Sequence, residues 1–219
     1  MAGRILNRLD IFGGAARLVK YTALTPQPVL LEDIIQTGAE PGDERGELQA
    51  GWSDIGATDD GLALTVSWDG EDWEVDQSRF TVKQQITKAE YMLETNLAEA
   101  SLENLQFGWD LDEITSTAAV SGTNVCQRSV PLGVPGAFTE RMIAFLVERP
   151  EYDSEVLRYR AYIFYIVARN TTDSEHAYNK TDKVLVPISF KARPDICKSD
   201  WSCIGVVLDE CIAEMPPCP

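Results

Sequence analysis

Alternation of apolar and polar residues is the dominant pattern along this chain. The clearest case lies within the stretch from Gly51 to Phe107, over residues 62–68. A side-chain period of two is typical of a β-strand with one covered face. In this segment one apolar set alternates with smaller residues, and the apolar set comprises Leu62, Leu64, Val66 and Trp68. Asp69-Gly70 then gives a turn signal, because glycine tolerates a positive φ. The pattern therefore predicts that this strand ends before residue 69.

Further alternating segments follow on both sides of this strand. We expect strands at residues 16–24, 73–76, 82–87, 90–97, 142–148, 157–168 and 184–192. The segments 82–87 and 90–97 are expected to form a hairpin. Residues 157–168 form the strongest of these patterns, and their second half is apolar on both faces, as in a strand covered on both sides.

Helical spacing is short everywhere and is convincing only at Ser101–Phe107. Ser101 is placed to cap the N-terminus of this helix through its hydroxyl oxygen, and Gly108 is placed to stop it. About eight strands and one reliable helix suit a mainly β fold. We expect a β-sandwich or partly open barrel with one flanking α-helix, long loops and terminal arms.

The chain divides into three predicted regions. Residues 1–14 read as an N-terminal arm, with apolar residues at helical spacing before Gly13-Gly14. Residues 15–194 form the β domain, in which the Gly-rich and charged segment 36–50 is an exposed loop. Residues 195–219 form a C-terminal tail that carries most of the cysteines.

The net charge of the chain argues against two classes of binding partner. The 219 residues include 19 basic and 35 acidic residues, for a net charge of −16. This balance argues against a surface that binds nucleic acid by neutralising phosphates, and against docking on an anionic membrane. The same charge would keep a concentrated protein soluble.

The sequence offers little catalytic chemistry. The single histidine, His176, lies in a polar loop, and no nucleophile elbow, phosphate-binding loop or metalloprotease pattern occurs. We therefore expect a protein that is not an enzyme and that holds no cofactor or metal. There is no secretory signal, and the longest apolar run, 161–168, is far short of the roughly 20 residues that span a bilayer. Synthesis in a cytoplasm is the expectation.

Four of the five cysteines lie close to the C-terminus. Their spacing does not match the close pairs of zinc sites. A cytoplasm keeps thiols reduced, whereas a particle released into an oxidising medium allows bridges. We expect disulfides within the C-terminal group, with free thiols or a zinc site as the alternatives, and a lone thiol at Cys126. The C-terminal group is Cys197, Cys203, Cys211 and Cys218.

The order of motifs in 51–107 resembles the major tail (tail tube) proteins of long-tailed bacteriophages. The motifs are GAT-x-x-G at 56–61, an alternating strand, EVDQ at 74–77, another alternating strand, and LAEASLENL at 97–105. The cysteine-bearing tail is not part of that pattern. The resemblance implies a virion protein whose copies form hexameric rings, joined edge to edge into a barrel and stacked around a lumen. Genomic DNA would pass through the lumen without specific binding, after assembly in the host cytoplasm. The other implied partners are tail proteins: the terminator, the tape measure and the distal tail protein.

Alternation also assigns roles within such a barrel, which needs one apolar and one water-lined face. The expected subunit joint comprises Val82, Gln84, Ile86, Tyr91, Leu93 and Leu97. The expected lumen-facing set comprises Lys83, Gln85, Glu94 and Asn96. The alternative function is a monomeric β-sandwich binding module, such as a baseplate or adhesion component.

Overall fold

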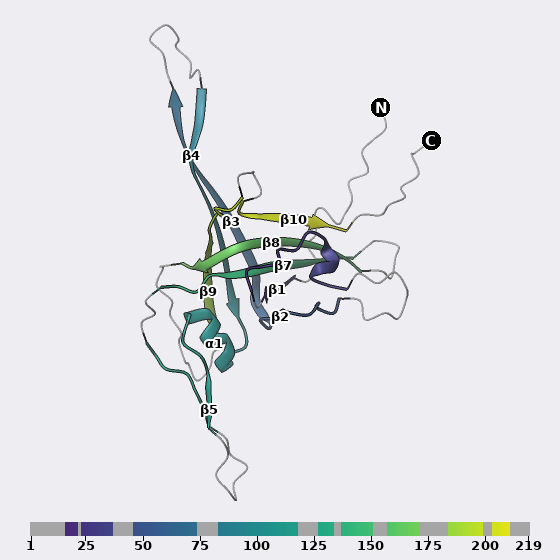
Figure 1. Ribbon diagram of the computed structural model, residues 1–219, viewed down its shortest axis with the longest axis vertical. Coiled ribbons are helices and arrows are strands. Elements are labelled where there is room, and N and C mark those ends of the chain that lie inside the picture. Colours follow the sequence, from purple (N-terminus) through teal and green to yellow (C-terminus); the bar gives the residue numbers. More distant parts are fainter. Residues whose placement is uncertain are drawn as a thin grey trace, which may run out of the picture. The chain divides into compact units, whose positions relative to one another are not determined.

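A computed structural model gives the fold (Figure 1), and it describes residues 16–21, 23–36, 46–73, 83–117, 127–133, 137–150, 157–170, 184–198 and 203–210. Several predictions fall on residues outside these ranges: the N-terminal arm, residues 37–45 of the exposed loop, residues 74–76 of the strand at 73–76, Val82, Cys126, His176, and the pair Cys211 and Cys218. Of the described residues, 57% are in strands and 8% are helical. The mainly β fold class with one α-helix is confirmed and is consistent with a β-sandwich, while its likeness to a tail tube stays a prediction.

Every strand pairing between described residues is antiparallel. The strands are β1 (Ala16–Tyr21), β2 (Trp52–Asp54), β3 (Thr58–Trp73), β4 (Lys83–Leu97), β5 (Thr115–Thr117), β6 (Gln127–Ser129), β7 (Arg141–Pro150), β8 (Leu157–Arg169), β9 (Val186–Ala192) and β10 (Gly205–Asp209). The helices are α1 (Leu102–Trp109) and a single 3-10 turn, η2 (Leu31–Asp33).

The chain folds into two compact units, each assembled from separate stretches. The first unit takes residues 1–57, 140–167 and 193–219, and the second takes 58–139 and 168–192.

The first unit is built on β2, β1, β7, β8 and β10, which pair in that order. Its core is aliphatic and aromatic, and it includes Val19, Ile34, Ile35, Met142, Leu146, Ala161 and Ile163. β10 lies in the region predicted to be a tail, yet it pairs with β8. An ion pair of 2.7 Å between Arg160 and Asp209 joins the same two strands and raises the pKa of Arg160. Part of the predicted tail is therefore a strand of this sheet.

In the second unit, α1 packs against β9. Ser101 caps the helix as predicted, because its Oγ accepts a hydrogen bond of 3.1 Å from the backbone N–H of Asn104. The predicted stop at Gly108 is wrong, since α1 continues to Trp109 and ends at Asp110 in the left-handed region, with φ 54°. Gly108 serves packing instead. A Cβ at this position would lie 3.0 Å from Cγ1 of Val186 in β9.

Two predictions about β3 and β4 are wrong. Asp69-Gly70 makes no turn, because β3 runs on through both residues to Trp73. Residues 82–87 and 90–97 do not form a hairpin with each other, because Lys83–Leu97 is one continuous strand whose partner is β3. One long antiparallel pairing runs through both segments, with a register shift at Asp69/Gly70, so the local turn signal does not end the strand.

Candidate functional site: the β3–β4 ribbon

The strands β3 and β4 extend beyond β9, the strand that pairs with the other side of β4. β9 pairs with β4 only over Met92–Leu97. Beyond that point, 66–73 pairs with 83–91, and neither segment pairs with another described strand. We call these two segments the ribbon, and Figure 1 shows it continuing past β9. Except for the half-buried residues Glu90 and Tyr91, the ribbon is exposed to solvent.

The register between the two strands assigns each residue of the ribbon to a face. Residues directly opposite each other in an antiparallel pair share a face of the sheet. Val66 pairs with Tyr91, and Leu64 pairs with Leu93. Trp68 pairs with Ala89, and its ring lies 6.2 Å from that of Tyr91, edge to face. One face, which we call the apolar face, therefore carries the alternating apolar residues of both strands.

A register shift at Thr87 keeps the apolar face continuous toward the end of the ribbon at Trp73 and Lys83. Lys88 pairs with Asp69, whereas Ile86 pairs with the next residue, Gly70, so Thr87 has no Cα partner in β3. The Thr87 hydroxyl instead donates a hydrogen bond of 3.1 Å to the Asp69 carbonyl. Because a shift of one residue exchanges the two faces of a strand, Ile86 falls on the same face as Tyr91.

The two predicted sets of residues consequently lie on opposite faces. The apolar face carries the described members of the predicted subunit joint, Gln84, Ile86, Tyr91, Leu93 and Leu97. The opposite face, which we call the polar face, carries the predicted lumen-facing set, Lys83, Gln85, Glu94 and Asn96. The register brings each set together along one face, while the roles at a joint or a lumen stay predictions.

Among the residues that the structure describes, those covering the apolar face lie only at its base. There Leu93 and Leu97 are buried, and the ring of Phe107 from α1 lies 5.1 Å from the ring of Phe190 in β9. Further along the same face, Trp68 is 58% exposed and Ile86 is 60% exposed. The apolar character of this face therefore continues beyond the helix that covers it. Sequence alternation places Trp68 on this face but does not reveal where the cover ends.

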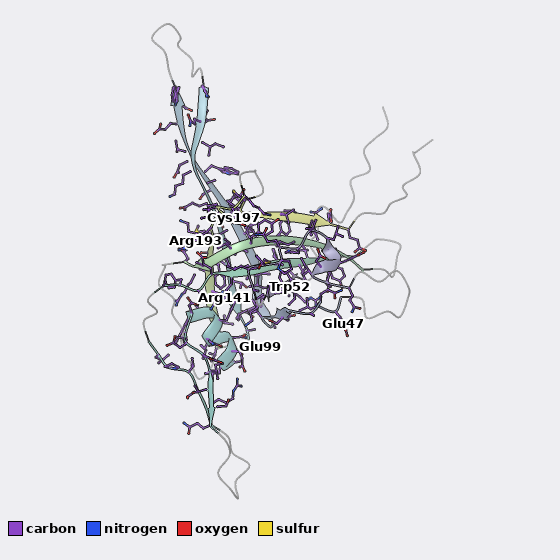
Figure 2. All side chains as sticks on the ribbon, viewed as in Figure 1. Glu47, Trp52, Glu99, Arg141, Arg193 and Cys197 are labelled. Carbon is purple, nitrogen blue, oxygen red and sulfur yellow. The ribbon has the colours of Figure 1, made fainter. Side chains whose placement is uncertain are left out.

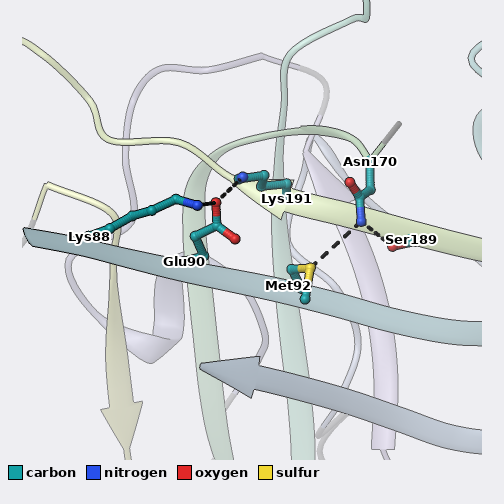
Figure 3. Close-up of polar contacts among 6 residues, drawn as sticks. All are labelled: Lys88, Glu90, Met92, Asn170, Ser189 and Lys191. Atoms are coloured by element: carbon teal, nitrogen blue, oxygen red, sulfur yellow. Dashed lines mark hydrogen bonds and ion pairs between the residues drawn. The ribbon is translucent and has the colours of Figure 1, made fainter. Parts of the chain in front are cut away.

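On the polar face, a carboxylate is held by two lysines (Figure 3). Glu90 lies between Lys88, at 2.9 Å, and Lys191 of β9, which donates a short hydrogen bond to the same Oε1. The hydrogen bonds from Lys191 and then from Lys88 lower the pKa of Glu90 from 4.5 to about 2. This cluster was not predicted from the sequence. The available signal was the i, i+2 spacing of Lys88 and Glu90, which places both on one face of a strand.

Uncharged polar groups continue this face beside the lysine cluster. Asn170 donates to Oγ of Ser189 at 3.3 Å and approaches Sδ of Met92 at 3.6 Å. Ser189 donates in turn to Oε1 of Glu94 at 3.3 Å. These bonds connect β9, β4 and the end of β8 on the same side of the sheet, so the polar face is an ordered surface (Figure 3).

Charges on the polar face nearly cancel. Among the described side chains that the register places on it, three are lysines and four are carboxylates: Lys83, Lys88, Lys191, Asp69, Glu71, Glu90 and Glu94. A surface of this kind has no continuous positive band with which to hold a phosphate backbone.

The part of the chain that the structure describes shows no disulfide and no metal site. Cys197 and Cys203 are free thiols, the first exposed and the second half-buried. Within the described ranges, no group of three or more histidine, cysteine or acidic side chains is arranged to hold a metal ion. Among the same residues, no helix has the length and apolar character needed to span a bilayer. Comparison with protein-family models and with curated proteins finds no match to this sequence.

Proposed function

We propose that this chain is a structural virion protein, the tail tube subunit of a long-tailed phage. Copies form hexameric rings, the rings stack, and genomic DNA passes through the lumen. The observation that carries the proposal is the apolar face of the ribbon, which extends beyond its own core. In the assembly, a neighbouring copy covers this face, and the polar face lines the lumen.

The energetics of the ribbon favour an assembled state. A two-stranded hairpin by itself is marginally stable in water. A tryptophan buries up to about 250 Å², and Trp68 is 58% exposed. Covering the remainder, roughly 140 Å², is worth up to about 3.5 kcal/mol per copy at about 25 cal/mol per Å². The outer edge of β3 is a second attractive surface, because unpaired strand edges pair readily with other chains.

The polar face suits a channel for DNA. Its charges nearly cancel, and its amide and hydroxyl groups bond to one another at the base of the ribbon. A lining of this kind neither grips phosphates through released counterions nor presents a strongly repulsive surface. In this proposal the protein conducts DNA without binding it specifically, and its other partners are the terminator, the tape measure and the distal tail protein.

Assembly of the purified chain tests the proposal. The wild-type chain should form rings or tubes as its concentration rises, measured by light scattering and seen in electron micrographs. Trp68→Ser should raise the concentration needed for assembly by tenfold or more, since about 1.4 kcal/mol corresponds to a factor of ten.

Trp73→Ser is the matched control. Trp73 lies on the same ribbon and is 56% exposed, but its pairing with Lys83 places it on the polar face. This variant should assemble nearly as the wild type does. A wild-type chain that stays monomeric at high concentration would favour the monomeric binding module. Equal effects of the two substitutions would refute the assigned role of the apolar face.

A further inference from the structure

Both ends of one loop in the first unit are bonded to adjacent residues of β8. The backbone N–H of Arg193 donates to the Ile166 carbonyl at 2.8 Å, and the N–H of Tyr165 donates to the Ile204 carbonyl at 3.2 Å. The chain between these two bonds is residues 194–203, which we call the β8 loop. β10 begins directly after this loop and pairs with β8. The attachment of the loop therefore sets where β10 starts on the sheet.

A single residue of the β8 loop, Asp195, is hydrogen-bonded to the backbone of two cysteines. Its Oδ1 accepts a bond of 3.0 Å from the N–H of Cys197, and its own N–H donates to the Cys203 carbonyl at 2.7 Å. The N–H of Lys198 donates to the Asp195 carbonyl at 3.0 Å, so 195–198 is a turn with Cys197 inside it (Cys197 is labelled in Figure 2). Both cysteines are thus held near the start of the loop.

Groups outside the β8 loop hold this turn in place. Gln27 donates to Oδ2 of Asp195 at 2.8 Å, so both carboxylate oxygens accept a bond. The bonds from the Cys197 N–H and from Gln27 lower the pKa of Asp195, which keeps it a charged acceptor well below neutral pH. The ammonium of Lys198 lies 3.9 Å from the centre of the buried Tyr165 ring. The turn is therefore fixed to the sheet on one side and to Gln27 on the other.

The separations that these bonds impose suit a disulfide. Residues bonded across an antiparallel pair have Cα atoms roughly 5.5 Å apart, and a turn brings its first and fourth Cα atoms within about 7 Å. A disulfide needs Cα atoms about 4.4–6.8 Å apart. Both thiols are free, Cys197 is exposed, and its turn begins at the residue bonded to Cys203. We propose that, on oxidation, Cys197 and Cys203 form a disulfide with each other, which fixes the start of β10 on β8.

The reaction is a thiol–disulfide exchange with a small disulfide such as oxidised glutathione. The exposed Cys197 attacks as the thiolate, forms a mixed disulfide and releases one glutathione thiolate. The Cys203 thiolate then attacks the sulfur of Cys197 and releases the second. Two electrons pass from the protein to the small disulfide, and the two protons lost by the cysteines end on the released thiols. Excess reduced glutathione reverses both steps.

Peptide mapping of the full chain identifies the bridge. The native chain is equilibrated with oxidised and reduced glutathione, quenched with acid, alkylated and digested. Trypsin and a glutamate-specific protease together release peptides 192–198 and 199–210, which carry Cys197 and Cys203 respectively and no other cysteine. The expected product is these two peptides joined by a disulfide. A bridge from Cys197 to any other cysteine, or a Cys197 that stays free at all glutathione ratios, would overturn the proposal.

Comparison with the unfolded chain shows whether the fold presents the two thiols to each other. The equilibrium constant for forming the bridge with glutathione should be at least about tenfold larger in the native chain than in urea, where a flexible loop gives only about millimolar effective concentration. Equal constants would overturn the proposal. Asp195→Ala removes the acceptor for the Cys197 N–H and should lower the native constant severalfold. Asp195→Asn keeps an oxygen there and is the matched control; equal losses in both variants would refute the role of that bond.

Hydrogen exchange measures the effect on β10. Oxidation should slow exchange of the β10 backbone amides by about tenfold, less than the roughly fiftyfold that loop entropy allows for a loop of about seven residues. Cys203→Ser cannot form the bridge and should show no such change. Unchanged exchange in the oxidised wild type would overturn the effect on β10. Trp68→Ser, in the second unit, should leave the bridge unchanged, so failure of the proposed tube and failure of this proposal can be told apart.

Discussion

Gly108→Ala should destabilise the second unit, although alanine is the better helix former. Gly108 lies inside α1, where glycine costs roughly 0.8–1.0 kcal/mol relative to alanine. By propensity alone the substitution should stabilise the fold. The added Cβ would, however, lie 3.0 Å from Cγ1 of Val186 and 3.6 Å from Cγ2 of Ile188.

The close contact of the new Cβ should outweigh the gain in helix propensity, because neither Val186 nor Ile188 can move easily. Val186 is 0% exposed and Ile188 is 3% exposed. Both are β-branched, with few accessible rotamers. Overpacking a core costs typically about 1–3 kcal/mol. Subtracting the gain in propensity leaves a net loss of about 1 kcal/mol in the free energy of unfolding.

Urea unfolding monitored by fluorescence measures this loss as a lower midpoint concentration of urea at an unchanged m value. Gly133→Ala is the matched control. A Cβ at Gly133 would meet only Oδ2 of Asp112, at an ordinary 3.9 Å. It should be neutral or stabilise by up to about 1 kcal/mol, by restricting the unfolded chain.

A double-mutant cycle identifies the contact responsible. Val186→Ala removes the methyl group that the new Cβ approaches. In the Gly108→Ala background it should therefore cost less than in the wild type, by about 0.5–3 kcal/mol, the usual range for residues in contact. Stabilisation by Gly108→Ala, or a coupling energy near zero, would refute the reasoning about close packing between α1 and β9.

Four further predictions concern Glu90, Ser101 and the cysteines. The pKa of Glu90 is lowered from 4.5 to about 2, so its stabilising effect is complete above about pH 4.5 and is lost as the pH falls toward 2. Glu90→Gln should therefore flatten the acid side of a stability–pH profile, and an unchanged profile would contradict this. Ser101→Ala should cost about 1 kcal/mol and Ser101→Gly only a few tenths, measured by urea unfolding; equal losses would argue against the capping bond. In reduced protein both Cys197 and Cys203 should react with a thiol reagent, Cys197 faster because it is exposed. In mature, oxidised particles of the proposed tail tube, fewer than five thiols per chain should react under denaturing, non-reducing conditions, with Cys126 among those that do.

The sequence predicts individual strands well because alternation is a local property. The segment 157–168 matches β8 almost residue for residue. The turn predicted at Asp69-Gly70 fails because glycine permits a turn without requiring one, and the long pairing with β4 satisfies more backbone groups. β10 was not predicted as a strand, since five residues carry little pattern and the partner, β8, is distant in sequence.

The sequence predicts which residues of the ribbon share a face, but it does not predict which of them are exposed. The register puts the described members of the predicted joint set on one face and the predicted lumen set on the other, although 82–87 and 90–97 do not form the expected hairpin. Leu64 and Trp68 are equivalent in the alternation, yet Leu64 lies nearer the base that α1 and β9 cover, whereas Trp68 lies beyond it. Where a covering element ends depends on tertiary packing. Local periodicity does not encode it.

The unsupported length of the ribbon also makes its local stability lower than that of the base, where β9 pairs with β4. Stability varies across a structure, and segments with few packed neighbours open first. Backbone amides of 83–89 should therefore exchange with solvent hydrogen much faster than those of 92–97, which β9 pairs. Contact with a neighbouring copy would then protect the ribbon and bury its apolar face, with a negative heat-capacity change. The free energy spent on ordering the ribbon lowers the affinity of isolated copies for one another. In such an assembly, addition of a copy to an end that already presents an ordered ribbon would accordingly be favoured over nucleation from free copies in solution.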